Sequence, residues 1–166
     1  MRDIEFRGKR TDNGEWVYGY YAHLHKTTYC FKEDYDAHPE NELHRIIFEH
    51  EQDWGLPNYH LQVDVDPETV GQYTGLKDKN GTKIFEGDIV KCVDANNGGS
   101  FTAIVSFGNP NCEYNWGFQL VQMGGDNLNT HILLWVDMEE DGAYIEVISN
   151  IYDYAKYLRL HENNRR

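Results

Sequence analysis

Short runs of alternating apolar and polar residues, separated by turn signals, constrain this chain most. Residues 4–7 alternate in this way, and residues 15–21 are rich in aromatic and β-branched side chains. Between them lies Asp12-Asn13-Gly14, and Asn and Gly tolerate the positive φ of a tight turn. Because strand side chains alternate between two faces, the pattern predicts an N-terminal β-hairpin.

Similar signals continue along the chain. Asp66 followed by Pro67 predicts a capped, short helical turn, and residues 77–82 predict a second hairpin turn. Further strands are expected at residues 27–31, 84–93 (with a Gly-Asp kink), 101–107, 116–121, 133–136 and 143–148. At the end of the chain the period changes to that of one helical face, at Ile151, Tyr154, Ala155 and Leu158.

These elements predict a mainly β fold of the α+β class. We expect the N-terminal hairpin, a small SH3-like barrel or curled antiparallel sheet, and a C-terminal helix. Residues 1–60 would hold the hairpin and an acidic excursion, and residues 61–166 the β-rich core. Within the excursion, residues 43–48 fit a strand or a helical turn, and the sequence leaves open whether residues 32–60 are ordered.

The charge of the chain limits its partners. The 166 residues carry a formal net charge of -13, which disfavours long nucleic acid and anionic membranes. The acidic residues concentrate in residues 32–68 and 92–155, and the second stretch has no Lys or Arg. The bases gather in residues 1–31, 69–91 and the tail, so a small phosphorylated ligand remains compatible with the composition.

Bases and aromatic residues gather on the predicted hairpin. A guanidinium beside an aromatic ring can hold a phosphate while the ring stacks on a base. The hairpin is therefore the candidate ligand-binding site, with Arg7, Lys9, Arg10, Trp16, Tyr18 and Tyr20. The alternative is that the aromatic residues pack in the core and the bases pair with the acidic segments.

Other candidate chemistry is sparse. His23 and His25 share a strand face and are able to bind a metal, but no carboxylate lies at ligand spacing, so we expect surface or interface histidines and no metal. Asp64 is expected to be solvated and Asp66 to cap the helical turn. Nucleophile and phosphate-loop motifs are absent from the sequence. We therefore expect no enzyme and no cofactor; a metal-dependent hydrolase using His23 and His25 is a distant alternative.

The three cysteines, Cys30, Cys92 and Cys112, form no Cys-x-x-Cys pair. Free thiols in a reducing compartment are expected, although the sequence leaves a Cys92–Cys112 disulfide open. The N-terminus has no apolar signal-peptide core, and the longest apolar run, residues 132–136, is too short to span a bilayer. We expect a cytoplasmic protein without membrane partners.

Several motifs resemble those of one family. They are Phe6-Arg7-Gly8-Lys9, the segment from Gly14 to Gly19, the block from Val65 through Asp78-Lys79-Asn80-Gly81, residues 84–90, and Glu146-Val147-Ile148-Ser149-Asn150-Ile151-Tyr152. In this order they resemble the YopX-like proteins of phages and prophages. The chain departs from that family at Ser149, where Gly is usual, and after Tyr152, where it lacks the usual Glu-Asn-Pro stretch.

The resemblance implies a phage accessory protein that acts in the host cytoplasm and assembles as a homo-oligomer. The resemblance implies no catalytic residues, because none are agreed for the family. Together with the hairpin, it suggests a binder that sequesters a host factor or a small signalling nucleotide, with a possible anti-defence role. The alternative is an acidic protein-interaction module that engages a host DNA-binding protein.

Overall fold

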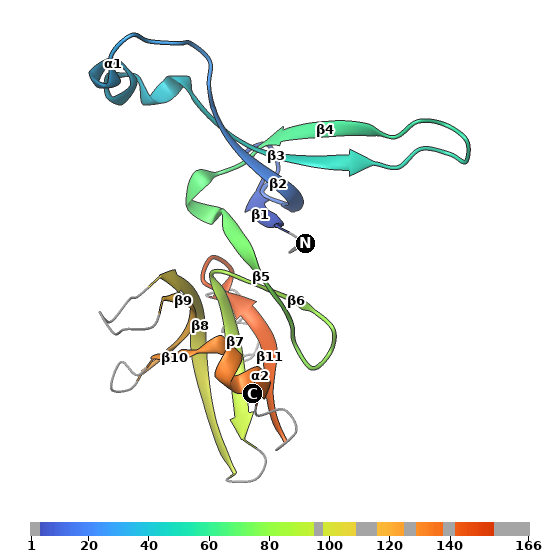
Figure 1. Ribbon diagram of the computed structural model, residues 1–166, viewed down its shortest axis with the longest axis vertical. Coiled ribbons are helices and arrows are strands. Elements are labelled where there is room, and N and C mark those ends of the chain that lie inside the picture. The colour runs from blue at the N-terminus through green and yellow to red at the C-terminus, as the bar shows by residue number, and fades with distance from the viewer. Residues whose placement is uncertain (1–3, 95–97, 109–115, 125–128, 138–141, 155–166) are drawn as a thin grey trace, which may run out of the picture. The chain divides into compact units, whose positions relative to one another are not determined.

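The computed structural model describes residues 4–94, 98–108, 116–124, 129–137 and 142–154. The chain divides into two compact units, Met1–Gln72 and Tyr73–Arg166. Both consist mainly of antiparallel β-strands, and the helices between the strands are short (Figure 1). The mainly β fold predicted from the sequence is confirmed.

The first unit consists of four strands and the start of a fifth. They are β1 (Phe6–Lys9), β2 (Trp16–His25), β3 (Glu42–His50), β4 (Tyr59–Asp64) and the first residues of β5 (Gly71–Lys77). Neighbouring strands are antiparallel in the order β4-β3-β2-β1-β5. The β1–β2 hairpin is present as predicted: the Gly14 amide donates to the Arg10 carbonyl at 3.0 Å, and Gly14 has φ of 72°.

Strand β2 pairs with two different strands along its length. Its first residues, through Gly19, pair with β1, and from Tyr20 onward it pairs with β3. Gly19 has φ of 157°, and a Cβ there would lie 2.3 Å from the Ile47 carbonyl oxygen. Only glycine therefore lets β3 approach at this point.

The core of the first unit lies on the face of the β1–β2 hairpin opposite Trp16 and Tyr18. It contains the buried Val17, Ile46 and Val65, with Phe6 and Tyr21 packed against them. The odd-numbered Val17 and Tyr21 of β2 thus face the core, and the even-numbered Trp16 and Tyr18 face away from it, as strand geometry requires.

The acidic excursion has regular structure. It comprises α1 (Lys32–Ala37), the 3₁₀ turn η1 (Pro39–Asn41) and β3, so residues 43–48 are a strand. Residues 27–31 were expected to form a strand but do not. Strand β2 ends at His25, and these residues lead from it into α1, which begins at Lys32. Asp66 caps η2 (Pro67–Thr69) as predicted, accepting a hydrogen bond from the Glu68 amide at 3.1 Å.

Residues 61–72 group with the first unit, whereas the sequence division placed them in the second region. The reason is that β4 pairs with β3 along its whole length. The strand signal of residues 59–64 is weak in isolation, since it alternates for only six residues.

The second unit contains a five-stranded sheet in the order β10-β9-β8-β7-β11. Its elements after β5 are β6 (Lys83–Phe85), β7 (Asp88–Asp94), β8 (Gly99–Gly108), β9 (Gly117–Gln122), β10 (Asn129–His131), α2 (Ile132–Asp137) and β11 (Ala143–Asn150). The core lies where Ile84, Val90 and Leu120 meet. Within the described residues neither sheet closes on itself. Of the two predicted alternatives, the open antiparallel sheet is therefore present and the closed SH3-like barrel is not.

Two further predictions fall in this unit. Residues 133–136 form part of α2 and not a strand: Ile132 and Trp135, three apart, meet the core, while Leu133 and Leu134 are exposed. A short apolar run does not by itself distinguish the two structures. The predicted C-terminal helix falls mostly on residues 155–166, outside the described residues.

Cys92 is buried and its thiol is free, so it does not form the disulfide with Cys112 that the sequence left open. Burial raises the pKa of this thiol to about 12, so it stays protonated and inert. Cys112 lies outside the described residues, and Cys30 is free and exposed.

Asp78 holds the β5–β6 turn against β11. One carboxylate oxygen accepts hydrogen bonds from the Asn80 and Thr82 amides, each at 2.8 Å, and the other accepts one from the Val147 amide at 3.1 Å. Burial acts against ionisation of Asp78, but the hydrogen bonds together outweigh it and hold the pKa below its usual value.

Replacing Gly19 with Ala should lower the free energy of unfolding by about 2–4 kcal/mol, because the new Cβ meets the Ile47 carbonyl and the backbone must shift. Gly14→Ala is the matched control: its φ is also positive, but nothing lies within 4 Å of a Cβ there, so about 1 kcal/mol is expected. Urea denaturation measures both. Equal losses in the two variants would contradict the role given to Gly19.

Asp78→Asn should cost about 1.5–3 kcal/mol of unfolding free energy at pH 7, because the amide NH₂ would face the Val147 N–H, a donor against a donor. Since the folded-state pKa of Asp78 is lowered, its contribution is present at neutral pH and is lost as the pH falls through that pKa. The difference in unfolding free energy between the wild type and the variant should therefore become smaller below about pH 4. Denaturation at several pH values tests this, and a gap independent of pH would refute it.

Candidate ligand-binding site

Four of the six predicted site residues meet on one face of the β1–β2 hairpin. Arg7 lies directly opposite Tyr18, and Lys9 lies opposite Trp16. Directly opposed side chains in an antiparallel pair lie on the same face. The hairpin register therefore brings together two cations and two aromatic rings.

The Trp16 ring is the centre of this group. The Arg7 guanidinium lies 4.7 Å from the ring centroid and the Lys9 ammonium 5.2 Å from it, both within cation–π range. Arg7 is only 6% exposed, whereas Lys9 and Trp16 are half-buried and Tyr18 is exposed. A ligand would therefore reach Lys9, Trp16 and Tyr18, whereas Arg7 adds its charge from a buried position over the Trp16 ring.

Arg10 is engaged elsewhere. Its Nε donates to Asp12 Oδ1 at 2.9 Å and its terminal nitrogen to Asp12 Oδ2 at 2.6 Å, a two-pronged ion pair in the hairpin turn. The hydrogen bonds from Arg10 hold the pKa of Asp12 below its usual range. The alternative was that the bases pair with the acidic segments of the chain. Arg10 does pair with an acidic residue, but that residue belongs to the hairpin itself.

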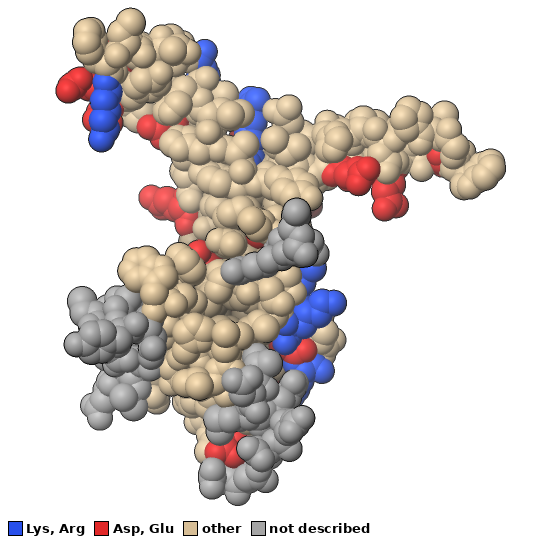
Figure 2. All heavy atoms as spheres, in the orientation of Figure 1, with Lys and Arg blue, Asp and Glu red and all other residues tan. Residues whose placement is uncertain are grey.

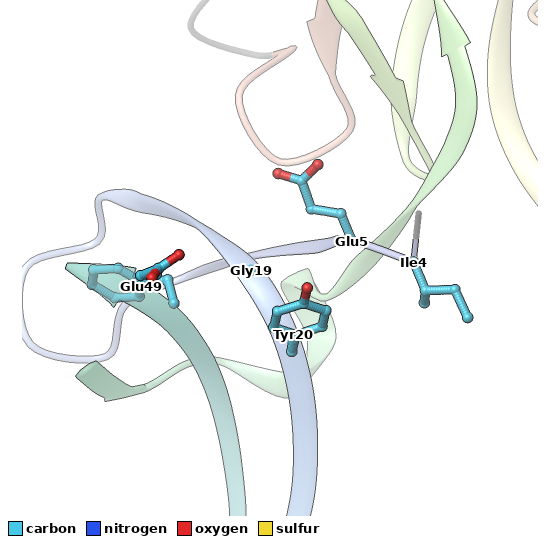
Figure 3. Close-up of a pocket in the computed structure, with 6 residues that line it drawn as sticks. Ile4, Glu5, Gly19, Tyr20 and Glu49 are labelled. Carbon is cyan, nitrogen blue, oxygen red and sulfur yellow. The ribbon is translucent and has the colours of Figure 1, made fainter. Parts of the chain in front are cut away.

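Tyr20, the remaining predicted residue, lines a cavity of about 300 Å³. The cavity is lined by the segment before β1, by β2 and by β3 (Figure 3), through Ile4, Glu5, Gly19, Tyr20, Phe48 and Glu49. Two of these residues are carboxylates, which repel a phosphate. The sequence did not indicate Glu49 as a neighbour of Tyr20, because the contact depends on β3 joining β2 after Gly19.

The other sequence candidates also have defined places. Asp64 is not merely solvated: it accepts a hydrogen bond from Arg45 Nε at 2.7 Å. His23 and His25 lie at the far end of β2, and His23 is opposite His44 on β3. Both side chains are exposed, in keeping with the surface or interface position predicted from the sequence.

A family model described as YopX protein matches residues 5–159. The chain belongs to the YopX family. The match confirms the resemblance seen in the sequence motifs, and it includes the hairpin that carries the Trp16 group. No curated protein matches the chain. Across the described ranges, no helix has the length and apolar character needed to cross a membrane.

Proposed function

We propose that this YopX family member is a phage-encoded accessory protein that works by binding and not by catalysis. As a homo-oligomer in the host cytoplasm, it would sequester a small phosphorylated ligand of the signalling-nucleotide class and so interfere with host defence. The observation that carries the proposal is the Trp16 ring with two cations over it and Tyr18 exposed beside it.

This face offers both halves of a nucleotide-recognition site. An exposed ring stacks on any base, because every base has a π-face. The 46% exposed Tyr18 supplies such a ring. Lys9 supplies a cation for a phosphate, and the buried Arg7 charge, also over the Trp16 ring, adds to the positive potential there.

The distribution of charge supports a small ligand over a polymer. On the face shown in Figure 2, Lys and Arg occur in small separate groups with acidic side chains among them. Binding of long nucleic acid relies on many phosphate contacts along a continuous basic track. The carboxylates of Glu5 and Glu49 next to Tyr20 further confine a phosphate to the Lys9 end of the hairpin.

Assembly into an oligomer is supported by the β3–β4 arm, residues 48–61. Beyond Ile47, β3 pairs with β4 alone among the described residues, and a two-stranded ribbon is marginally stable in water. Figure 1 shows this ribbon ending in a loop. Trp54 and Leu56 in that loop, and Tyr59 after it, are exposed. A second copy of the chain covering these side chains would stabilise the arm.

Native mass spectrometry of the intact protein with cyclic nucleotides and ADP-ribose-type nucleotides tests the proposal. We expect an oligomer and a mass shift of one ligand per site. Lys9→Met should weaken binding about tenfold, the equivalent of 1.4 kcal/mol. Lys32→Met, which removes the same charge from the exposed start of α1, should leave affinity unchanged. Asp12→Asn should strengthen it, because it releases Arg10 from its ion pair.

A monomer, or an oligomer that binds none of these nucleotides, would overturn the proposal. Equal loss of affinity in Lys9→Met and Lys32→Met would show that net charge and not the hairpin site governs binding. Capture of a basic, DNA-binding host protein at low salt, with no nucleotide bound, would favour the acidic interaction module instead.

A further inference from the structure

Strands β2 and β3 bring four metal-ligating side chains together at the end of the pair farthest from Gly19. In the register of these strands, His23 lies opposite His44 and His25 lies opposite Glu42. All four residues continue the face of Tyr21 and Ile46, which are also directly opposed. Strand β2 alone offers only His23 and His25, because the carboxylate and the third histidine, Glu42 and His44, come from β3.

Three of these residues converge on a single point. The Nε2 atoms of His23 and His44 lie 3.3 and 3.4 Å from the same carboxylate oxygen, Glu42 Oε2. One donor atom from each residue lies within 4.8 Å of the other two. The two imidazole rings are stacked, with centroids 4.5 Å apart and planes 12° from parallel.

These separations fit a shared cation better than simple hydrogen bonds. With bonds of about 2.0–2.2 Å, two ligands of a tetrahedral Zn²⁺ lie about 3.3–3.6 Å apart. A histidine that hydrogen-bonds a carboxylate directly comes closer, as His38 Nδ1 does to Glu40 Oε1 at 2.8 Å in the same unit. Both distances to Glu42 fall in the range for a shared ion.

Tyr21 orients one of the histidines. Its hydroxyl lies 2.5 Å from Nδ1 of His44. With the ring proton on Nδ1 and donated to the Tyr21 oxygen, the lone pair of His44 is on Nε2, the atom that faces Glu42. Metal-binding histidines generally have their second nitrogen held by such a partner, which sets the tautomer and the ring angle.

The site is accessible and leaves room for a fourth ligand. The side chains of His23, Glu42 and His44 are 44%, 33% and 18% exposed, so an ion can enter from solvent. Two imidazoles and one carboxylate are ligands that suit Zn²⁺ with an open fourth position. His25, whose ring centroid is 5.1 Å from that of His23, or a water molecule would complete the shell.

We propose that His23, Glu42 and His44 form a binding site for a divalent transition-metal ion of the Zn²⁺ class. The ion would join β2 to β3 beside the Lys26–Asn41 hydrogen bond, where the amide of Lys26 donates to the Asn41 carbonyl at 2.8 Å. It would thereby fix the ends of the segment that contains α1. The site lies at the opposite end of β2 from the Trp16 group, so it is independent of nucleotide binding.

Titration of the metal-free full chain with ZnCl₂ alone, followed by calorimetry, tests the site. One equivalent should bind per chain, and the same stoichiometry should hold for Co²⁺, with the visible absorption of a four-coordinate ion. Glu42→Gln and His44→Ala should weaken Zn²⁺ binding at least 100-fold, and Tyr21→Phe about 10-fold because only the orienting partner is lost. His38→Ala is the matched control, since His38 also contacts a carboxylate but, within the described part of the chain, shares it with no second histidine.

Circular dichroism on each variant establishes that it folds, and Glu42→Gln preserves side-chain shape if His44→Ala does not fold. Bound Zn²⁺ should also raise the melting temperature of the wild type and not that of Glu42→Gln. The proposal is overturned if the wild type binds no Zn²⁺, or if His38→Ala loses as much affinity as His44→Ala. Unchanged affinity in Glu42→Gln would likewise refute the three-residue site.

Discussion

The change of partner along β2 is the constraint on which the first unit depends. A single strand pairs with β1 up to Gly19 and with β3 from Tyr20 onward. The change is possible because no side chain separates Gly19 from the Ile47 carbonyl. It places β3 and then β4 beside β2, and it buries Ile46 next to Val17 and Val65. Without it, the excursion after β2 would have no sheet edge to join.

Both proposed sites follow from the alternation of side chains along β2. Its even-numbered residues Trp16 and Tyr18 face away from the core, where β1 sets Arg7 and Lys9 against them. Its odd-numbered residues continue from the core at Tyr21 to His23, where β3 supplies Glu42 and His44. The face that begins with the apolar core thus ends in three side chains, His23, Glu42 and His44, that are able to bind a metal ion. One strand carries an aromatic, cationic surface at one end and a histidine cluster at the other.

Features set by neighbouring residues were predictable from the sequence, whereas contacts between distant residues were not. Turns such as residues 12–14 and the cap at Asp66 depend on neighbouring residues and were predicted correctly. The register of a hairpin follows from its turn, so the meeting of Lys9 with Trp16 was also within reach. Residues 133–136 were misassigned, because a short apolar run satisfies a buried strand and a helix turn equally. Arg10 was included in the site because its bond to Asp12 was not foreseen.

The sequence by itself determined the mainly β class, the N-terminal hairpin with its bases and aromatic rings, and the YopX family. These depend on local pattern and on motifs read in order along the chain. Only the tertiary structure decided which of those bases are accessible to solvent, since burial of Arg7 arises from packing around it. It alone decided that His23 has a carboxylate and a second histidine beside it. Those residues lie about twenty positions away in the chain, and strand pairing between β2 and β3 brings one ligand atom from each to within 4.8 Å of the others.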